Sequence, residues 1–184
     1  MHVSSVLAHA PGVLFGLGYV LLIVDILRKK WRPQRVTWFI WTAVNFIVLW
    51  GMYQKHAVND VIVVATICTA AVAGLSVWRG LGGWTTMDKL CVGGAVIGAA
   101  IAAIRPTAGL VASCLVILIG ALPTFAHAYR EPKKENFLAW GFFWMGSTWC
   151  ALCLPDRSLA VSAQPITFLL LNAIVFSLLW PERD

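Results

Sequence analysis

The apolar positions of this chain form long runs that short polar stretches interrupt. A helix needs about 20 mostly apolar residues to cross the hydrocarbon core of a bilayer. Seven such runs are expected as membrane-spanning helices, at residues 8–28, 36–54, 59–79, 86–104, 107–129, 136–154 and 163–180. The interruptions combine charge with Gly or Pro, as in Arg28-Lys-Lys-Trp-Arg-Pro33. The pattern predicts an all-α, polytopic membrane protein whose neighbouring helices run antiparallel.

Composition agrees with this pattern. Of 184 residues, 60% are hydrophobic and only 12% are charged, and the mean hydropathy is +0.80, which excludes a soluble globular surface. The ten Trp residues fit the enrichment of that side chain at membrane interfaces. Because no basic region precedes the first apolar run, we expect the first helix to be retained rather than cleaved as a signal peptide.

The basic residues predict the orientation. Eleven of the 14 Lys and Arg residues fall on one side of the predicted bundle: Arg28, Lys29, Lys30, Arg32, Arg35, Arg79, Lys89, Arg130, Lys133, Lys134 and Arg183. The other side has Lys55, Arg105 and Arg157. Since Lys and Arg gather in cytoplasmic loops, we expect an inner-membrane protein with its N-terminus outside and its C-terminus in the cytoplasm.

The two halves of the chain match each other. A shift of 99 residues places Pro33 on Pro132, Trp41 on Trp140 and Trp50 on Trp149. This offset predicts one membrane domain, 1–184, of two three-helix repeats at 8–79 and 107–180. The segment 86–104 would be a linker helix that gives both repeats the same orientation, in a 3+1+3 order. Its small residues, with Gly94 and Gly98 four apart, favour close helix packing.

The chain resembles the PQ-loop superfamily of membrane transporters, which includes the SWEET sugar facilitators and, more distantly, the PnuC vitamin transporters. It is most similar to a family of bacterial seven-helix proteins of this length. Three motifs carry the resemblance: Pro33-Gln-Arg-Val-Thr-Trp-Phe-Ile-Trp41, Pro123-Thr124 and Pro132-Lys-Lys-Glu135. The resemblance implies two three-helix bundles, an outside N-terminus and a substrate site between the bundles.

One proline departs from the pattern of the superfamily. There the Pro-Gln pair lies inside the first helix of each repeat, whereas Pro33 precedes the second helix. The corresponding position is Pro123-Thr124 in the second repeat and Val24-Asp25 in the first. Because a proline inside a helix removes a backbone hydrogen bond and kinks the helix, Pro123 is predicted to be a hinge in the second repeat only.

Polar residues near the middle of the predicted helices are the candidate substrate-binding residues, since such residues are costly in a bilayer. They are Asn45, Thr66, Thr69 and Asn172. An Asn amide offers donors and an acceptor to an uncharged polar solute, and a Trp face can stack on a sugar or a flat ring. The Trp candidates are Trp41, Trp140 and Trp144. The alternative is that the Asn residues bond across helices and the Trp residues fill space or anchor the interface.

The ionisable residues suggest local roles. Asp25 is expected to pair with Arg28 and Lys29, with a proton-coupling site as the alternative. His127 lies near a helix end, and Glu135 at the start of a helix fits helix-entry charge. We predict no metal and no cofactor, because no ligands stand at metal spacing.

These features predict a uniporter or facilitator for a small, mostly uncharged polar solute such as a sugar, vitamin or nucleoside, and not an enzyme. Membrane lipids are expected partners, nucleic acid is not, and a homo-oligomer remains open. One alternative is a non-transporting assembly or lipid-binding protein, because the basic loops suit anionic lipids. Another is a membrane thiol oxidoreductase that uses Cys150 and Cys153. A retinal protein is excluded because the last predicted helix has no lysine.

Overall fold

The computed structural model describes residues 2–84 and 86–180, and its regular elements are helical. They are α1 (His2–Leu27), α2 (Arg35–Tyr53), α3 (Asp60–Arg79), α4 (Thr86–Ile104), α5 (Pro106–Gly120), α6 (Leu122–Arg130), the 3₁₀ helix η1 (Pro132–Lys134), α7 (Phe137–Leu152) and α8 (Leu159–Leu178). Each predicted segment is helical, and 107–129 is divided into α5 and α6. Arg183 lies outside the described residues.

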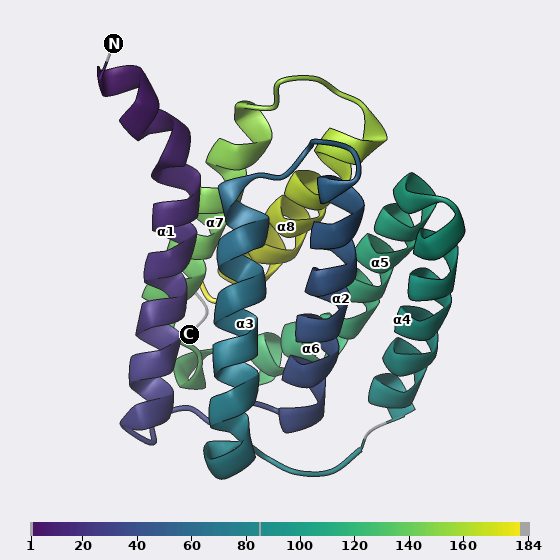
Figure 1. Ribbon diagram of the computed structural model, residues 1–184. Helices are drawn as coiled ribbons and strands as arrows, with labels where there is room; N and C mark the ends of the chain where they lie inside the picture. Colours follow the sequence, from purple (N-terminus) through teal and green to yellow (C-terminus); the bar gives the residue numbers. More distant parts are fainter. Residues whose placement is uncertain (1, 85, 181–184) are drawn as a thin grey trace.

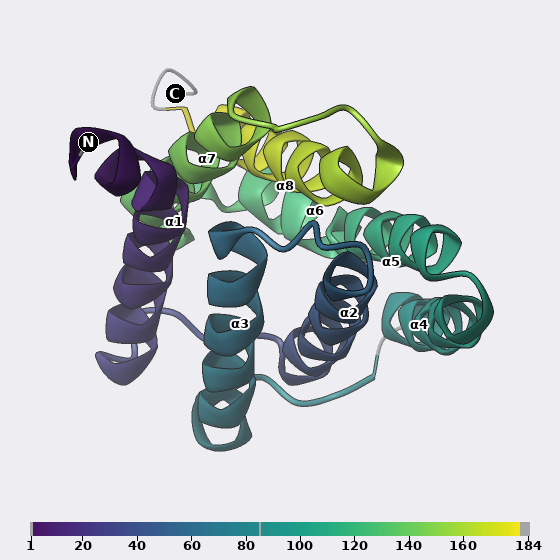
Figure 2. The same cartoon turned by 45° about the horizontal axis from the view of Figure 1, so that its top comes forward.

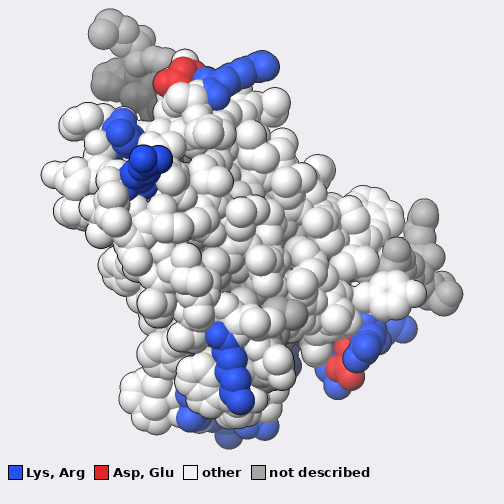
Figure 3. Space-filling view, turned by 90° about the vertical axis from the view of Figure 1, so that its right-hand side faces the viewer, with Lys and Arg blue, Asp and Glu red and all other residues white. Residues whose placement is uncertain are grey.

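The helices indicate a membrane-embedded protein. Five helical stretches of the described chain are long and apolar enough to cross a bilayer: His9–Leu27, Arg35–Tyr53, Asp60–Arg79, Pro106–Arg130 and Leu159–Leu178. α4 is not among them, and α7, with 16 residues, is shorter than the usual span. One side of the molecule is uncharged across its middle and carries Lys and Arg at both ends (Figure 3). This distribution is that of a bundle with an apolar belt.

The helices pack in two layers with matching internal order. α3 lies between α1 and α2 in one layer, and α8 packs against α5, α6 and α7 in the other (Figures 1 and 2). Across the layers, α1 packs on α7 and α2 packs on α5. α4 stands at the edge, against α5 and α2. In each layer the helix that packs on the others, α3 or α8, is the last of that layer in the sequence, and the earlier helices pack across the layers.

Two glycines allow α1 and α7 to approach closely. A Cβ on Gly146 would lie 2.8 Å from the carbonyl oxygen of Pro11 and 3.0 Å from the backbone nitrogen of Phe15. A Cβ on Gly18 would lie 2.6 Å from the ring of Phe143. Real Cβ atoms do not come so near to backbone atoms, so only glycine fits at position 146 without a shift of one helix. Small residues serve this purpose where helices pack in membranes.

The loops between α1 and α2, α3 and α4, and α6 and α7 lie together at one end of the bundle, here called the basic end (Figure 1). There Arg35 ties the start of α2 to the end of α3, because its Nε and Nη2 donate to the carbonyl oxygens of Ser76, at 3.1 Å, and Val77, at 2.9 Å. A guanidinium suits the carbonyl-rich end of a helix. The loops α2–α3, α4–α5 and α7–α8 form the opposite end.

Candidate functional site

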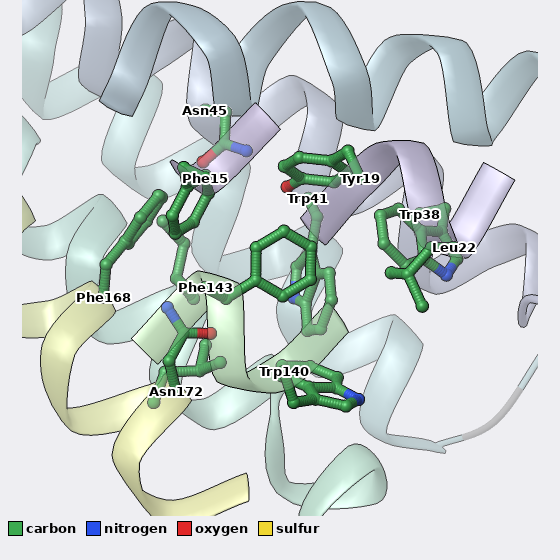
Figure 4. Close-up of a pocket in the computed structure, with 12 residues that line it drawn as sticks. Phe15, Tyr19, Leu22, Trp38, Trp41, Asn45, Trp140, Phe143, Phe168 and Asn172 are labelled. Atoms are coloured by element: carbon green, nitrogen blue, oxygen red, sulfur yellow. The ribbon is translucent and has the colours of Figure 1, made fainter. Parts of the chain in front are cut away.

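A small cavity lies between the two layers near the middle of the bundle. Its volume is about 50 Å³, and both layers contribute side chains to its wall (Figure 4). Seven aromatic residues line it: Phe15, Tyr19, Trp38, Trp41, Trp140, Phe143 and Phe168. Asn45 and Asn172 are the two amides among its lining residues, and Figure 4 shows them on opposite sides of the ring cluster. The cavity has room for one or two water molecules, at ~30 Å³ each.

The two asparagines are bonded within their own layers and face each other's layer. Asn45 is 4% exposed and its Nδ2 donates to Oγ1 of Thr69 at 3.4 Å, a long bond that joins α2 to α3. Asn172 is 3% exposed and its Nδ2 donates to Oγ of Ser147 at 3.2 Å, which joins α8 to α7. Oδ1 of Asn45 has no hydrogen-bond partner among the described residues. A buried acceptor without a donor is costly, so this atom is available to a ligand.

A second buried polar atom beside the cavity is also unpaired. Nε1 of Trp41 has no acceptor in the described part of the chain. Trp41 follows Trp38 in α2 by one turn, and their rings meet edge to face at 5.3 Å between centroids. Both atoms belong to residues of α2 that line the cavity, and Nε1 of Trp41 lies beside Gly120 of α5.

The other three predicted binding residues lie away from the cavity wall. Thr66 and Thr69 are buried in α3, where their hydroxyls donate to the carbonyl oxygens of Ile62 and Ala65, each at 2.7 Å. Thr69 reaches the cavity only through its bond with Asn45. The ring of Trp144 stacks on Phe176, with centroids 5.1 Å apart and planes 7° apart, and is 36% exposed.

The aromatic wall includes residues that the sequence did not single out. Phe15 stacks on Phe168 across the two layers, with centroids 5.5 Å apart. Tyr19, one turn after Phe15, meets Phe143 edge to face at 4.8 Å. The spacing of Phe15, Tyr19 and Leu22 on one face of α1 is a signal that could have identified them. They contribute much of the contact between α1 and the second layer.

A larger cavity of about 280 Å³ opens at the basic end, and we call it the vestibule. Trp38, Trp41 and Trp140 line both the vestibule and the central cavity, so these rings separate the two spaces. The polar residues of the vestibule wall are Arg32, Gln34, Thr37, Asp88, Thr124, His127 and Glu135. The vestibule is thus much more polar than the aromatic cavity beyond it.

Glu135 has a larger role than helix-entry charge. Its side chain is only 4% exposed, and Nε1 of Trp140 donates to its Oε2 at 3.0 Å. Its Oε1 lies 2.9 Å from Nδ1 of His127. This carboxylate therefore joins the end of α6 to one of the rings between the vestibule and the cavity.

A second buried carboxylate stands on the other side of the vestibule. Asp88 of α4 is buried, and Oγ1 of Thr37 donates to its Oδ1 at 3.1 Å. Thr37 directly precedes Trp38 in α2 and lies about one turn before Trp41. The vestibule is consequently flanked by one carboxylate from α4 and one from the segment between η1 and α7.

Two asparagines at helix N-termini connect the layers at the two ends. At the basic end, Asn136 caps α7 by accepting from the backbone of Ala139, and its Nδ2 donates to Oδ2 of Asp25 at 2.6 Å. Asp25 thus bonds to Asn136 of the other layer, a partner that was not expected from the sequence. At the opposite end, Asn59 caps α3 and its Nδ2 donates to Oε1 of Gln164 at 2.8 Å. Each asparagine satisfies a helix end and holds an element of the other layer.

The opposite end also has a pocket, of about 590 Å³, that includes Asn59, Asp60 and the pair Cys150 and Cys153. Both thiols are free; Cys150 is buried and Cys153 is exposed. The buried Phe15–Phe168 stack and the Asn59–Gln164 bond lie between this pocket and the central cavity. Among the described residues, none lines both this pocket and the central cavity, whereas three Trp residues line both the cavity and the vestibule.

Pro123 lies at the junction of α5 and α6, within the candidate span Pro106–Arg130. α5 ends at Gly120 and α6 begins at Leu122, so the break directly precedes the proline. Since Pro123 has no N–H, it cannot bond to the carbonyl of Ile119 as a helical residue would. Trp41 packs on this break, because a Cβ on Gly120 would lie 3.1 Å from Nε1 of Trp41. The break thus contacts the cavity wall directly.

Comparison with protein-family models, with curated proteins and with solved structures gives no match. Within the described residues, no three His, Cys, Asp or Glu side chains are grouped so that they could hold a metal ion. The geometry of the cavity, the vestibule and the pocket at the opposite end is therefore the basis for any functional assignment.

Proposed function

We propose that this protein is a membrane transporter, a uniporter or facilitator that moves a small, mostly uncharged polar solute by alternating access. Its architecture would be two three-helix units, α1–α3 and α5–α8, with α4 as the linker. Matching packing supports this arrangement: the third membrane segment touches both others in each unit, and first and second segments pack reciprocally across the units. The resemblance to PQ-loop transporters predicts the same arrangement.

The observation that carries the proposal is the central cavity with its unpaired amide oxygen. Asn45 and Asn172 come from different units and face one aromatic enclosure. Oδ1 of Asn45 can accept from a solute hydroxyl or N–H, and the surrounding rings can stack on an apolar face. A site of this kind favours a neutral solute, because none of the described residues that line the cavity is charged.

The arrangement fits a state that is open toward the basic end. The vestibule leads to the three Trp residues next to the cavity, while Asn59 and Gln164 hold the units together at the opposite end. By the distribution of Lys and Arg, the basic end would face the cytoplasm. A cavity of about 50 Å³ is too small for a sugar or nucleoside, so binding would require the units to move apart around it.

An uptake panel in proteoliposomes tests the proposal. Sugars, nucleosides, vitamins and amino acids are presented to the wild type and to Asn45→Ala and Asn172→Ala. We expect one class to be taken up, and uptake to fall at least about tenfold in either variant, the loss that follows from one or two hydrogen bonds to the solute. Ligand-induced thermal stabilisation across the same compounds gives an independent measure of binding.

Trp41→Phe and Trp50→Phe form a matched control pair in α2. Trp41 lines the cavity, whereas Trp50 is exposed on the lipid-facing surface, so only the first substitution should reduce uptake. If no compound crosses or binds, or if Asn45→Leu and Asn172→Leu retain full function, the transporter proposal is wrong.

The closed opposite end makes a separate prediction. Asn59→Ser keeps a capping side chain but is too short to reach Gln164. We expect it to increase the rate of maleimide labelling at the buried Cys150 about threefold or more, because loss of one hydrogen bond makes opening of this end less costly in free energy. The exposed Cys153 should label at an unchanged rate. Peptide mass spectrometry after labelling measures each cysteine separately.

Asn136→Ser is the control for this prediction. It makes the same change at the cap of α7 and breaks the bond with Asp25 at the basic end. Cys150 labelling should not increase in this variant. Equal increases in both variants would mean that the cap substitution loosens the whole fold, and no increase in Asn59→Ser would mean that the Asn59–Gln164 bond does not close this end.

A second candidate function, lipid binding or assembly without transport, is favoured by one feature. A groove of about 550 Å³ runs between α2 and α4, and its wall is apolar except for Arg35. Trp84 also lines the groove, and Phe39, Val92 and Val96 are among its apolar residues. An acyl chain fits such a surface, and the guanidinium suits an anionic headgroup. This function predicts no dependence on Asn45 or Asn172.

A further inference from the structure

Glu135 connects the helix that follows the Pro123 break to the wall of the central cavity. The two carboxylate oxygens have different partners: Oε2 accepts from the indole of Trp140, and Oε1 contacts the imidazole of His127. His127 is on α6, four residues after Pro123, and Trp140 is on α7. A change in the bond between His127 and Glu135 therefore acts on both the broken helix and a ring beside the cavity.

His127 lies between two carboxylates. Nδ1 is 2.9 Å from Oε1 of Glu135 and Nε2 is 3.6 Å from Oε2 of Glu131. A neutral imidazole has one N–H and can donate to only one of them, whereas an imidazolium donates from both nitrogens. Protonation thus adds a second charge-assisted contact, and the neutral ring leaves one nitrogen lone pair facing a carboxylate.

We propose that His127, Glu131 and Glu135 form a proton-binding site, and that its protonation regulates transport by favouring the state in which the vestibule is open. One proton passes from vestibule water to the imidazole of His127 and returns to water by the reverse step; no other bond forms or breaks. This inference rests on the proposed transport function, because the proton would act by stabilising the open-vestibule state of a transporter.

The imidazole of His127 faces carboxylates at both of its nitrogens. Glu131 is held as a carboxylate because the hydrogen bond from Lys134, at 2.6 Å, lowers its pKa, and the charges of Lys134 and His127 lower it further. Glu135 is nearly buried beside the ring. When the ring is neutral, Lys134 alone balances the two carboxylates, and protonation of His127 would supply the second positive charge.

The other charged groups near the site belong to few elements. α8, which packs on α6, has no ionisable side chain, and Cys114 is the only one in α5. Asp25 is bonded to Asn136, the residue next to Glu135. The remaining charged groups of α6, η1 and the vestibule wall are Arg130, Lys133, Arg32 and Asp88.

The direction of the effect follows from linkage. A proton that binds one conformation more tightly shifts the population toward that conformation. The observed arrangement, with the vestibule open, places both carboxylates around His127, so acidification should favour it. Histidine is the side chain whose charge changes most readily near neutral pH, which makes the shift accessible to a cytoplasmic change in pH.

Labelling of a cysteine in the vestibule tests this site without any solute. Gln34→Cys lines the vestibule from the start of α2, away from α6 in the sequence, and its reaction with a water-soluble maleimide is followed by peptide mass spectrometry in nanodiscs between pH 6 and 8. The same cysteine in a His127→Gln background is the reference, because the ratio of the two rates cancels the ionisation of the thiol itself. The five native cysteines stay in place.

We expect the ratio to rise at least about threefold on going from pH 8 to pH 6, because protonation adds one charge-assisted contact that stabilises the open-vestibule state. Glu135→Gln, which keeps the size and the acceptor for Trp140, should flatten the profile, and so should Glu131→Gln in part. A flat ratio overturns the proton site, provided that His127→Gln unfolds at the same temperature as the wild type. It would leave the transport proposal standing, whereas a failed uptake panel would leave this profile unchanged.

Discussion

Gly146→Ala is expected to destabilise the protein, although alanine is the better helix former. The new Cβ would lie 2.8 Å from the carbonyl oxygen of Pro11 and 3.0 Å from the backbone nitrogen of Phe15. Because these are backbone atoms, α1 and α7 must move apart, and overpacking of this kind costs about 1–3 kcal/mol. For a chain of this length the melting temperature should fall by about 3–10 °C, measured by thermal unfolding in detergent.

Gly74→Ala is the matched control. Gly74 also lies inside a helix, α3, but a Cβ there would meet no atom within 4 Å. The substitution should therefore stabilise the protein by up to about 1 kcal/mol, the difference in helix propensity. A stabilised Gly146→Ala would show that α1 and α7 are not in such close contact.

The positions of the helices could be predicted because they depend on local sequence. Apolar runs of membrane length and loops rich in charge and Pro specify where each helix begins and ends, so all seven predicted segments are helical. The contacts between segments could not be derived in this way. Nothing local indicates that α1 would pack on α7, since Gly18 and Gly146 are ordinary glycines until the two helices meet.

The candidate site was predicted in part. Asn45 and Asn172 stand out because polar residues are rare in such helices, and Trp41 and Trp140 because the repeat offset joins them. Phe15, Tyr19, Phe143 and Phe168 are hidden among many apolar residues. Glu135 could not be identified either: next to Lys133 and Lys134 it suggests surface charge, and only the fold buries it between His127 and Trp140.

Pro123→Ala is expected to reduce uptake of the solute that the panel identifies by at least about tenfold while leaving the protein equally or more stable. The alanine N–H can bond to the carbonyl of Ile119, which would join α5 and α6 into one continuous helix. Trp41, Glu135 and the vestibule all depend on this break: the ring packs on Gly120, and α6 places His127 beside the carboxylate. A straight helix would fix these contacts in one arrangement and prevent the units from rocking.

Pro165→Ala separates the break from a general effect of removing a proline. Pro165 also lies within a helix, but α8 runs through it without interruption. Its replacement should add a backbone hydrogen bond and stability with little change in uptake. Equal losses of uptake in the two variants would assign the effect to helix stiffness at any point in the second unit. Full uptake in Pro123→Ala would mean that the break at Ala121 does not move during transport. The units would then move about other contacts, such as the close approach of α1 and α7.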